Sequence, residues 1–459
     1  MASNNNIKIH EHFKVVPQSS TKTTSIPLTS LDIFWLRFHP VERIFFYTLP
    51  NSQSHPSFFF QTIVPNLKSS LSLNLQHFLP IAGKIIWDSE SQNPKIQYTP
   101  NNGVSLFIAE SDSDFNHVIE NTPHESSLSR SFIPHLESTD SFASIISIQI
   151  TFFPRSGFSI GISTHHAVFD GKSSTMFIKA WAYLSKKTIE MNEYSPTLLP
   201  ELEPLFNREI MKDPKLKMLP NEKGNEKSLE ILPFEPKLKD YARATFELKH
   251  EDLDKIKQRV LSTWEISDKR ESKPQNLSSF VLTCAYSLVC IAKAIHKVEN
   301  DKEKFAFAFG VDCRARLEPP LPNNYFGNCV SGQFIDTQPL DFIKEDGVFL
   351  VAKSIYERIN TINEKGALER DINNVCDKFS CLSREGFEVM GVAGSNRFCV
   401  YEIDFGWGRP EKVEIVSIDR GLTIGLAKRN DGIEIGVVLN KHVMDHFSTL
   451  FLEGLCTNN

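Results

Sequence analysis

A change of composition near the middle of the chain constrains the fold more than any other sequence feature. Residues 188–240 are rich in Pro, Lys and Glu and show little periodic hydrophobicity, whereas both flanking regions alternate strand-like and helix-like patterns. A long polar segment between two patterned regions is typical of a linker between domains. The sequence therefore predicts two α/β domains of similar size, residues 1–187 and 241–459, joined by a linker over residues 188–240.

Each predicted domain alternates strands and helices. Period-two runs rich in β-branched and aromatic residues predict strands, and apolar residues at helical spacing predict helices. Strands are expected at 7–16, 41–48, 145–153, 158–164, 245–248, 305–311, 397–403, 413–418 and 433–439, and helices at 59–78, 173–184, 252–261, 279–296 and 347–362.

Composition narrows the class of protein. Of the 459 residues 41% are hydrophobic and 23% charged, as in soluble proteins with sizeable cores. The net charge of −6 provides no positive field for a polyanion, so we expect no nucleic-acid partner. No apolar run long enough for a membrane span occurs, and the N-terminus lacks the apolar stretch of a signal peptide. The eight Cys form no CxxC pair, which indicates reduced thiols and a cytosolic protein; we expect a monomer.

The segment Ser163–Gly171 contains the strongest candidate for a catalytic group. A β-rich run ends in His165 and His166, and Asp170-Gly171 precedes the next helix. A histidine at the end of a strand can reach a cleft, and its ordinary pKa near 6.5 lets it accept a proton at neutral pH. A single His-x-x-x-Asp pattern is common by chance, so on its own a structural histidine is the better interpretation.

Two later segments add context. One is Asp404-Phe405-Gly406-Trp407-Gly408, in which two glycines allow a tight backbone path around a large ring. The other runs from Asp312-Cys313-Arg314-Ala315-Arg316 to Tyr325-Phe326-Gly327-Asn328-Cys329. Each alone indicates only a structural loop.

Together these segments resemble the plant BAHD acyltransferases, whose signatures are HxxxD in mid-chain and DFGWG near the C-terminus. Pro27–Asp32 and Leu75–Lys84 resemble further segments of the family, so the resemblance covers essentially the whole chain. Tyr325–Cys329 resembles the branch that acylates phenolic glycosides, frequently with malonyl-CoA. Within the family the chain is most similar to phenolic-glucoside and anthocyanin malonyltransferases.

The resemblance implies a fold and a mechanism. It implies two chloramphenicol-acetyltransferase-like domains with a tunnel between them, which CoA enters from one face and the acceptor from the other. His166 would take the proton of the acceptor hydroxyl, and the acyl group would transfer directly from the CoA thioester, without an acyl-enzyme, bound cofactor or metal. Asp170 would pair with an arginine, for which Arg314 is the candidate, instead of orienting His166. The structural supports are Gly171, Asp404, Gly406, Trp407 and Gly408, with Trp407 nearer the tunnel wall.

Other residues are candidates for substrate contacts. Ser278 and Ser279 precede a long apolar helix as N-cap residues, and by resemblance this helix start lies along the CoA path, where it suits a phosphate. The malonyl carboxylate needs a cation in a cleft of low dielectric, and Lys172, Arg314 and Arg316 lie near the motifs. Lys172 equally fits a solvated lysine in a first helical turn.

Alternatives remain open at this point. Transfer of a hydroxycinnamoyl or other acyl group is possible in the same fold, and His165-His166 with Asp170-Gly171 also fits the HHxxxDG motif of peptide-condensation domains. A non-catalytic small-molecule-binding relative is the alternative of another class. His442 and His446 have i,i+4 spacing but lack the glutamate of a zinc-binding HExxH helix, so we expect no metal site.

Overall fold

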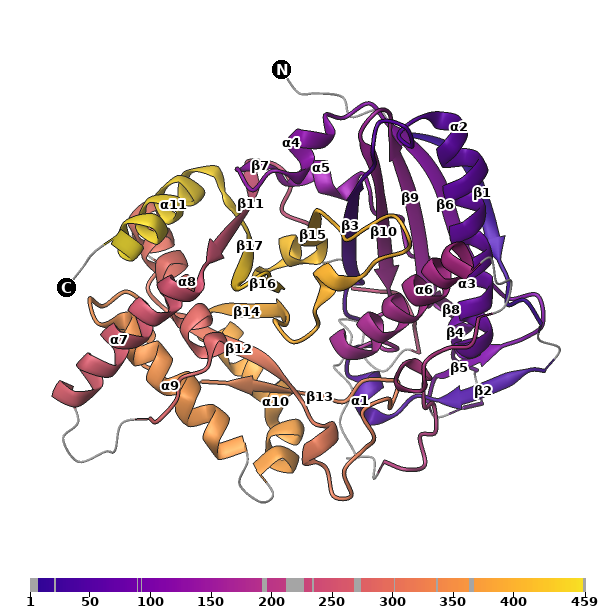
Figure 1. Ribbon diagram of the computed structural model, residues 1–459. Helices are drawn as coiled ribbons and strands as arrows, with labels where there is room; N and C mark the ends of the chain where they lie inside the picture. The colour runs from indigo at the N-terminus through magenta and orange to yellow at the C-terminus, as the bar shows by residue number, and fades with distance from the viewer. Residues whose placement is uncertain are drawn as a thin grey trace.

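The computed structural model describes residues 7–456 except 20–21, 89, 92, 192–195, 212–226, 233–234, 268–273, 301, 336 and 363–366. Two large sheets form two lobes that lie side by side (Figure 1). Each lobe has a large hydrophobic core of its own.

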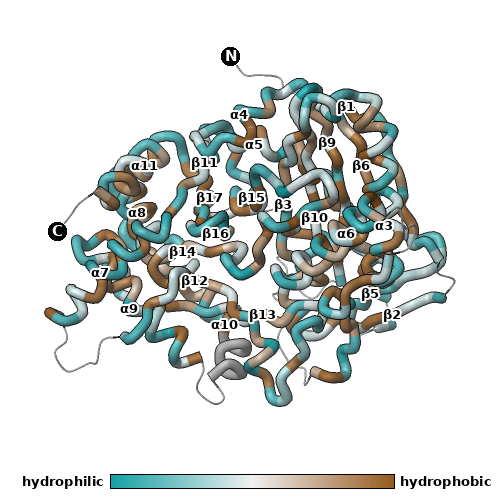
Figure 2. The backbone as a smooth tube through the Cα atoms, in the orientation of Figure 1, coloured by the Kyte–Doolittle hydropathy of each residue, from teal (hydrophilic) through white to brown (hydrophobic). Residues whose placement is uncertain are grey.

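The first lobe is built on a six-stranded sheet in the order β1-β6-β9-β10-β3-β15. Its strands are β1 (Ile7–Val15), β6 (Val104–Ser111), β9 (Ile146–Phe153), β10 (Gly157–Thr164), β3 (Val41–Thr48) and β15 (Lys412–Ile415). Every residue of β9 and β10 is buried, because α3 (Val64–His77) and α6 (Gly171–Met191) cover one face of the sheet (Figure 1) and a second cluster that includes Phe115, Leu128 and Phe132 covers the other. The apolar residues of these central strands form a continuous hydrophobic interior (Figure 2).

Smaller elements complete the first lobe. A four-stranded sheet has the order β2 (Thr24–Pro27), β5 (Lys95–Tyr98), β4 (Lys84–Ile86) and β8 (Phe142–Ser144). Short helices are α1 (Ser30–Ile33), α2 (Pro56–Phe58), α4 (Phe115–Ile119) and α5 (Ser126–Arg130). The helix expected over residues 59–78 is present, with one π-helical turn over Phe59–Ile63 before α3.

The second lobe is built on a seven-stranded sheet in the order β13-β12-β14-β16-β17-β11-β7. Its strands are β13 (Val330–Phe334), β12 (Phe305–Asp312), β14 (Glu388–Gly394), β16 (Leu422–Arg429), β17 (Gly432–Asn440), β11 (Tyr241–Leu248) and β7 (His124–Glu125). Its helices are α7 (His250–Ser267), α8 (Ser279–Val298), α9 (Gly347–Ile362), α10 (Ala367–Arg384) and α11 (Lys441–Cys456), which carries His442 and His446. Within the described ranges no group of His, Cys, Asp or Glu could hold a metal ion.

Helix α8 is the one described helix that is long and apolar enough to cross a membrane by length and composition alone. Of its apolar window 78% is buried inside the protein, where it packs in the core of the second lobe. This burial is what a core helix requires.

The two lobes exchange strands. β15 follows most of the second lobe in sequence yet pairs with β3 of the first sheet, and β7 of the first half pairs with β11 of the second (Figure 1). The segment expected to be a linker also packs inside the protein: Leu198 and Leu229 belong to the first core and Met211 to the second. The segment expected to be a linker therefore contributes side chains to the cores of both lobes.

One predicted strand is wrong. Residues 397–403 form a turn and a 3₁₀ helix (Val400–Glu402), with Cys399 in the left-handed region at φ 49°. The apolar side chains that suggested a strand, including Val400 and Ile403, are buried in the first core. The apolar residues of this segment correctly predicted burial, but the backbone of residues 397–403 pairs with no strand among the described residues.

Candidate active site

His166 lies in a loop that is fixed at both ends. Strand β10 pairs along its whole length with β9 and β3, and the loop begins where the His165 amide donates to the Ile145 carbonyl at 2.9 Å. The Ala167 amide donates to His165 Nδ1 at 3.2 Å. Helix α6 then begins at Gly171. His165 is therefore a buried structural residue, and His166 is the half-buried one.

Aromatic rings fix the plane of the His166 imidazole. The Trp35 ring stacks on it with a centroid distance of 4.0 Å and an interplanar angle of 7°, and Phe38 meets it edge-on at 6.3 Å. Nδ1 of His166 is buried and has no hydrogen-bond partner within the described residues, whereas Nε2 is not among the buried, unpartnered atoms of these residues and so remains accessible. We assign the proton of the neutral ring to Nδ1, which leaves Nε2 as the basic nitrogen.

Burial lowers the pKa of His166 to about 4, since the charged ring would lose its solvation. Its own backbone carbonyl acts in the opposite direction without offsetting this effect, and His39 lowers the pKa further. Burial likewise lowers the pKa of His165 to about 3. His166 is therefore neutral at physiological pH, in the state that can accept a proton.

Asp170 faces Arg314, as expected from the sequence. Its Oδ2 lies 2.8 Å from Arg314 Nη2, and both side chains are 1% exposed. The carboxylate also accepts from the amides of Ser173 at 2.8 Å and Cys329 at 3.2 Å. No hydrogen bond joins it to an imidazole among the described residues, so this arrangement fixes a loop and does not form a catalytic triad.

Arg314 is fully committed to this network. Its guanidinium donates to Asp312 Oδ1 at 2.9 Å, the Tyr325 carbonyl at 3.2 Å and the Gly327 carbonyl at 3.0 Å. Asp170 and Asp312 outweigh the cost of burial, so they raise the pKa of Arg314 above its ordinary value. The earlier suggestion that Arg314 binds an acyl carboxylate does not fit a guanidinium whose donors are already used.

A second buried carboxylate, that of Asp32, is linked to the His166 backbone through Asn328. Asn328 donates through Nδ2 to the His166 carbonyl at 2.8 Å and to Asp32 Oδ1 at 3.2 Å. Asp32 is inaccessible, caps α1 with Thr29, and lies 3.4 Å from Arg208. One hydrogen-bonded unit thus joins the histidine loop (residues 165–170) to the Pro27–Asp32 and Tyr325–Cys329 segments.

The Asp404–Gly408 loop is structural. Asp404 Oδ1 accepts from the amides of Gly406 at 2.8 Å and Gly408 at 3.0 Å, and its Oδ2 lies 2.8 Å from Lys186 of α6. Both glycines have positive φ, 110° and 97°, as this tight path requires. Trp407 packs edge-on against Phe158 near the start of β10, about 25 Å along that strand from His166. The expectation that Trp407 comes nearer the tunnel wall therefore gains no support beside His166.

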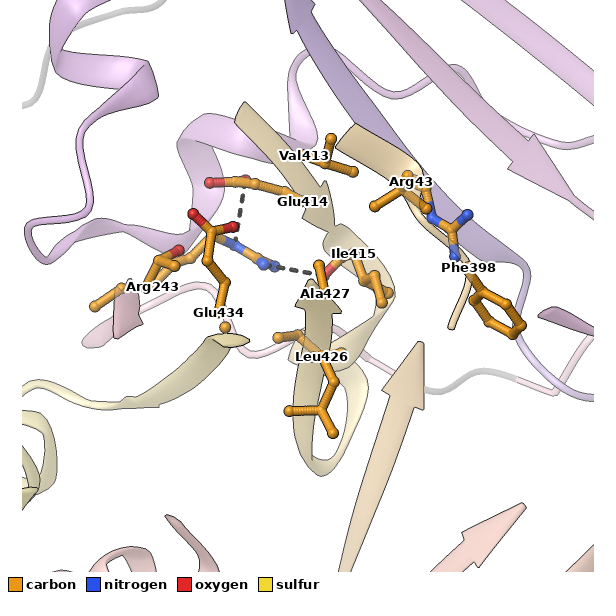
Figure 3. A pocket seen from close by; sticks show the side chains of 15 residues that line it. Arg43, Arg243, Phe398, Val413, Glu414, Ile415, Leu426, Ala427 and Glu434 are labelled. Carbon is orange, nitrogen blue, oxygen red and sulfur yellow. Dashed lines mark hydrogen bonds and ion pairs between the residues drawn. The ribbon is translucent and has the colours of Figure 1, made fainter. Parts of the chain in front are cut away.

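Cavities flank the site on two sides. One of about 30 Å³ is lined by residues of both lobes, including Arg43, Phe398, Val413 and Leu426 (Figure 3). Phe398 reaches the histidine loop, since a Cβ on Gly171 would lie 2.7 Å from its ring. The other cavity, of about 10 Å³, lies beside Trp35 and is lined also by Val330 and Gly332. Neither cavity is lined by His166 itself.

The remaining sequence candidates line neither cavity. Lys172 Nζ is bound to Asn323 Oδ1 at 3.0 Å and to Asp312 at 3.4 Å, and Arg316 donates to the Asp312 carbonyl at 2.9 Å; neither lines the larger cavity. Ser278 caps α8 as expected, with its Oγ accepting from the Val281 amide at 3.4 Å. Ser279 Oγ accepts from Asn396 Nδ2 at 3.1 Å, which links the start of α8 to the Phe398 loop.

Sequence reasoning missed Trp35, Asn328 and Arg43 as site residues. Asn328 lies inside a recognised motif, so the motif itself was an available signal. Trp35 comes three residues after Asp32, but nothing local indicates that its ring reaches His166. Arg43 looks like an ordinary residue of strand β3.

The Transferase family model matches residues 5–452. The chain is 38% identical to phenolic glucoside malonyltransferase 1 of Arabidopsis thaliana, over 98% of both proteins. It is 36% identical to malonyl-CoA:anthocyanidin 5-O-glucoside-6''-O-malonyltransferase of the same plant, over 98% of this chain and 99% of the relative. The crystal structure of vinorine synthase has the same fold, with a TM-score of 0.72 at 19% identity and 98% of each chain covered.

The match spans nearly the whole chain and includes the histidine loop, its arginine partner and the Asp404–Gly408 turn. The fold is the two-lobed chloramphenicol-acetyltransferase-like fold expected from the sequence. The chain therefore belongs to the Transferase family of BAHD acyltransferases, enzymes that take their acyl group from a coenzyme A thioester.

Proposed function

We propose that the protein transfers a malonyl group from malonyl-CoA to a sugar hydroxyl of a phenolic glucoside, such as that of a flavonoid, an anthocyanin or a simple phenol. The full-length similarity to phenolic glucoside and anthocyanidin glucoside malonyltransferases supports this substrate pair. The observation that carries the chemistry is the neutral His166, stacked on Trp35 with an accessible Nε2.

In the proposed mechanism His166 Nε2 accepts the proton of the sugar hydroxyl while its oxygen attacks the thioester carbonyl. The tetrahedral intermediate collapses, the C–S bond breaks, and the proton on His166 passes to the leaving thiolate of CoA. A positioned base of this kind contributes typically ~10²–10⁴-fold. Holding both substrates against the same imidazole contributes much of the rest. No acyl-enzyme is required.

The donor side is the larger cavity in this proposal. Ser278 and Ser279, at the start of α8, are joined to the Phe398 loop through Asn396, and a helix N-terminus suits a phosphate of CoA. The acceptor then approaches over Trp35. We further propose that residues 1–187 and 241–459 act as the two domains of a cytosolic monomer that needs neither nucleic acid nor a membrane.

A two-panel assay tests the proposal. The protein is incubated with malonyl-, acetyl- and coumaroyl-CoA against glucosides of simple phenols, flavonols and anthocyanidins, and products are identified by mass. We expect a mass increase of one malonyl group on a glucoside. A preference for coumaroyl-CoA in wild type would reject the malonyl donor in favour of the hydroxycinnamoyl alternative, and no product with any donor would support the non-catalytic alternative.

A further inference from the structure

Arg43 is a buried cation on the wall of the larger cavity. Arg43 lies in β3 and pairs with Ile162 of β10, which precedes His166 by four residues. Arg43 is 5% exposed. About 13 Å of strand separates the two backbones at ~3.3 Å per residue, a span that an arginine, a short acyl group and an imidazole can bridge together. The side chain therefore comes from the same strand pair that positions the base.

No acidic side chain in the described part of the chain forms an ion pair with Arg43. Its Nη1 donates to Thr175 Oγ1 at 3.3 Å. Burial lowers the pKa of Arg43 to about 10, and no carboxylate of the described residues acts in the opposite direction. In contrast, the buried Arg208, Arg243 and Arg314 lie 3.4, 3.9 and 2.8 Å from a carboxylate.

A buried cation without an anion is costly. An apolar side chain would fill the same place in β3 without that cost, as Ile44 and Phe45 do at the next two positions. The hydrogen bond from Arg43 Nη1 to Thr175 Oγ1 offsets only part of that cost. The charge therefore indicates an anion that enters from the cavity.

The acids on the cavity wall already have partners. Glu414 accepts from Ser129 Oγ at 2.7 Å and pairs with Arg243, and Glu434 pairs with Arg429 at 3.0 Å. Among the lining residues drawn in Figure 3, interactions join Arg243 to Glu414 and Ile415, and none joins Arg43 to another lining residue. The cavity of about 30 Å³ can hold about two groups the size of water, which matches the two oxygens of a carboxylate.

The Arg43 head group is also connected to the histidine loop. Thr175, its hydrogen-bond partner, donates to the Gly171 carbonyl at 2.7 Å. Gly171 directly follows Asp170, and its lack of a side chain admits the Phe398 ring. A malonyl thioester carries its carboxylate one methylene from the reacting carbonyl, so a cation beside this loop is suitably placed for it.

We propose that Arg43 binds the terminal carboxylate of the acyl group and thereby selects dicarboxylic monothioesters over neutral acyl donors. This inference rests on the proposed malonyl transfer. It replaces Lys172, Arg314 and Arg316, whose donors are engaged outside this cavity. The charge-assisted contact contributes selectivity because acetyl-CoA has no group to make it.

The test compares kcat/KM for malonyl-CoA and acetyl-CoA in wild type, Arg43→Met, Arg43→Lys and the control Arg155→Met. Methionine keeps most of the volume without the charge, and Arg155 is an exposed arginine in the turn at the opposite end of β10. We expect Arg43→Met to lower the malonyl-CoA value by about ten- to a hundredfold, as for loss of a hydrogen bond to a charged group. The acetyl-CoA value should change little, Arg43→Lys should be intermediate, and Arg155→Met should match wild type.

A second measurement needs no variant. Acetoacetyl-CoA has the shape of malonyl-CoA with a methyl group in place of one carboxylate oxygen. In wild type the inhibition constant of acetoacetyl-CoA should be at least tenfold higher than the dissociation constant of malonyl-CoA. Equal binding of the two would overturn the inference even if Arg43→Met failed to fold. So would equal losses for both donors in a folded Arg43→Met. A wild-type preference for acetyl-CoA would instead reject the malonyl proposal itself.

Discussion

Replacing Asp170 by Ala removes one partner of a buried ion pair. Arg314 is 1% exposed, so its charge cannot turn to water when Asp170 is lost. Breaking a buried pair on one side costs about 3–5 kcal/mol, and the buried amides of Ser173 and Cys329 lose their acceptor as well. Asp312 still contacts Arg314 at 2.9 Å. Because this partner remains, the expected loss of unfolding free energy does not exceed about 3–5 kcal/mol.

Urea unfolding followed by tryptophan fluorescence measures the change. Asp312→Ala is the matched control: its side chain is 44% exposed, so its loss should cost at most about 1 kcal/mol. Asp170→Ala with Arg314→Met should regain part of the loss, because no unpaired charge remains. A loss below about 1 kcal/mol for Asp170→Ala, with no recovery in the double variant, would refute this account of the pair.

Three further predictions use other parts of the structure. His166→Ala should lower kcat by ~10²–10⁴-fold with unfolding free energy nearly unchanged; a variant retaining a tenth of the wild-type rate would show that another group is the principal base. His165, whose pKa falls from 6.5 to about 3, binds a proton only when unfolded at pH 5, so its own contribution to stability should be nearly full above about pH 7 and fall by about 2 kcal/mol at pH 5; urea unfolding at both pH values should show a pH dependence weaker by about that amount in His165→Asn. Gly406→Ala, at φ 110° and with its Cβ 2.5 Å from Ile189, should cost more than about 1 kcal/mol by the same assay. Gly421→Ala, where the nearest atom is 3.5 Å away, should change stability little.

The sequence was a good guide wherever local pattern decides the structure. Strands β3 and β10 were expected at the places where they occur, since alternating and continuous apolar runs need no distant information. The histidine proposed as the base, its loop and the Asp170–Arg314 pair followed from motifs. The residues at 397–403 were misassigned because their apolar side chains fill the first core from a 3₁₀ turn, an arrangement with the same composition as a strand.

Contacts between distant residues were beyond the sequence. Asp32 and Asn328 are 296 residues apart, and neither segment alone indicates the other. Arg43 was overlooked because what distinguishes it is an absence: among the described residues no carboxylate forms an ion pair with it, and Glu414 and Glu434 of the same cavity wall pair with other arginines. Unpaired charge is a property of the assembled site, so only the structure could reveal it.

The strand exchange has a consequence during synthesis of the chain. β3, with its buried Ile44, Phe45 and Phe46, has β15 as one of its two neighbours. After β10 is complete, about 250 more residues must be made before β15 emerges, which takes tens of seconds at ~5–20 residues per second. Until then β3 is an apolar edge strand, open to pairing with another nascent chain. The last part of the chain thus protects the first, so a protein shortened before Lys412 should aggregate even though its histidine loop is intact.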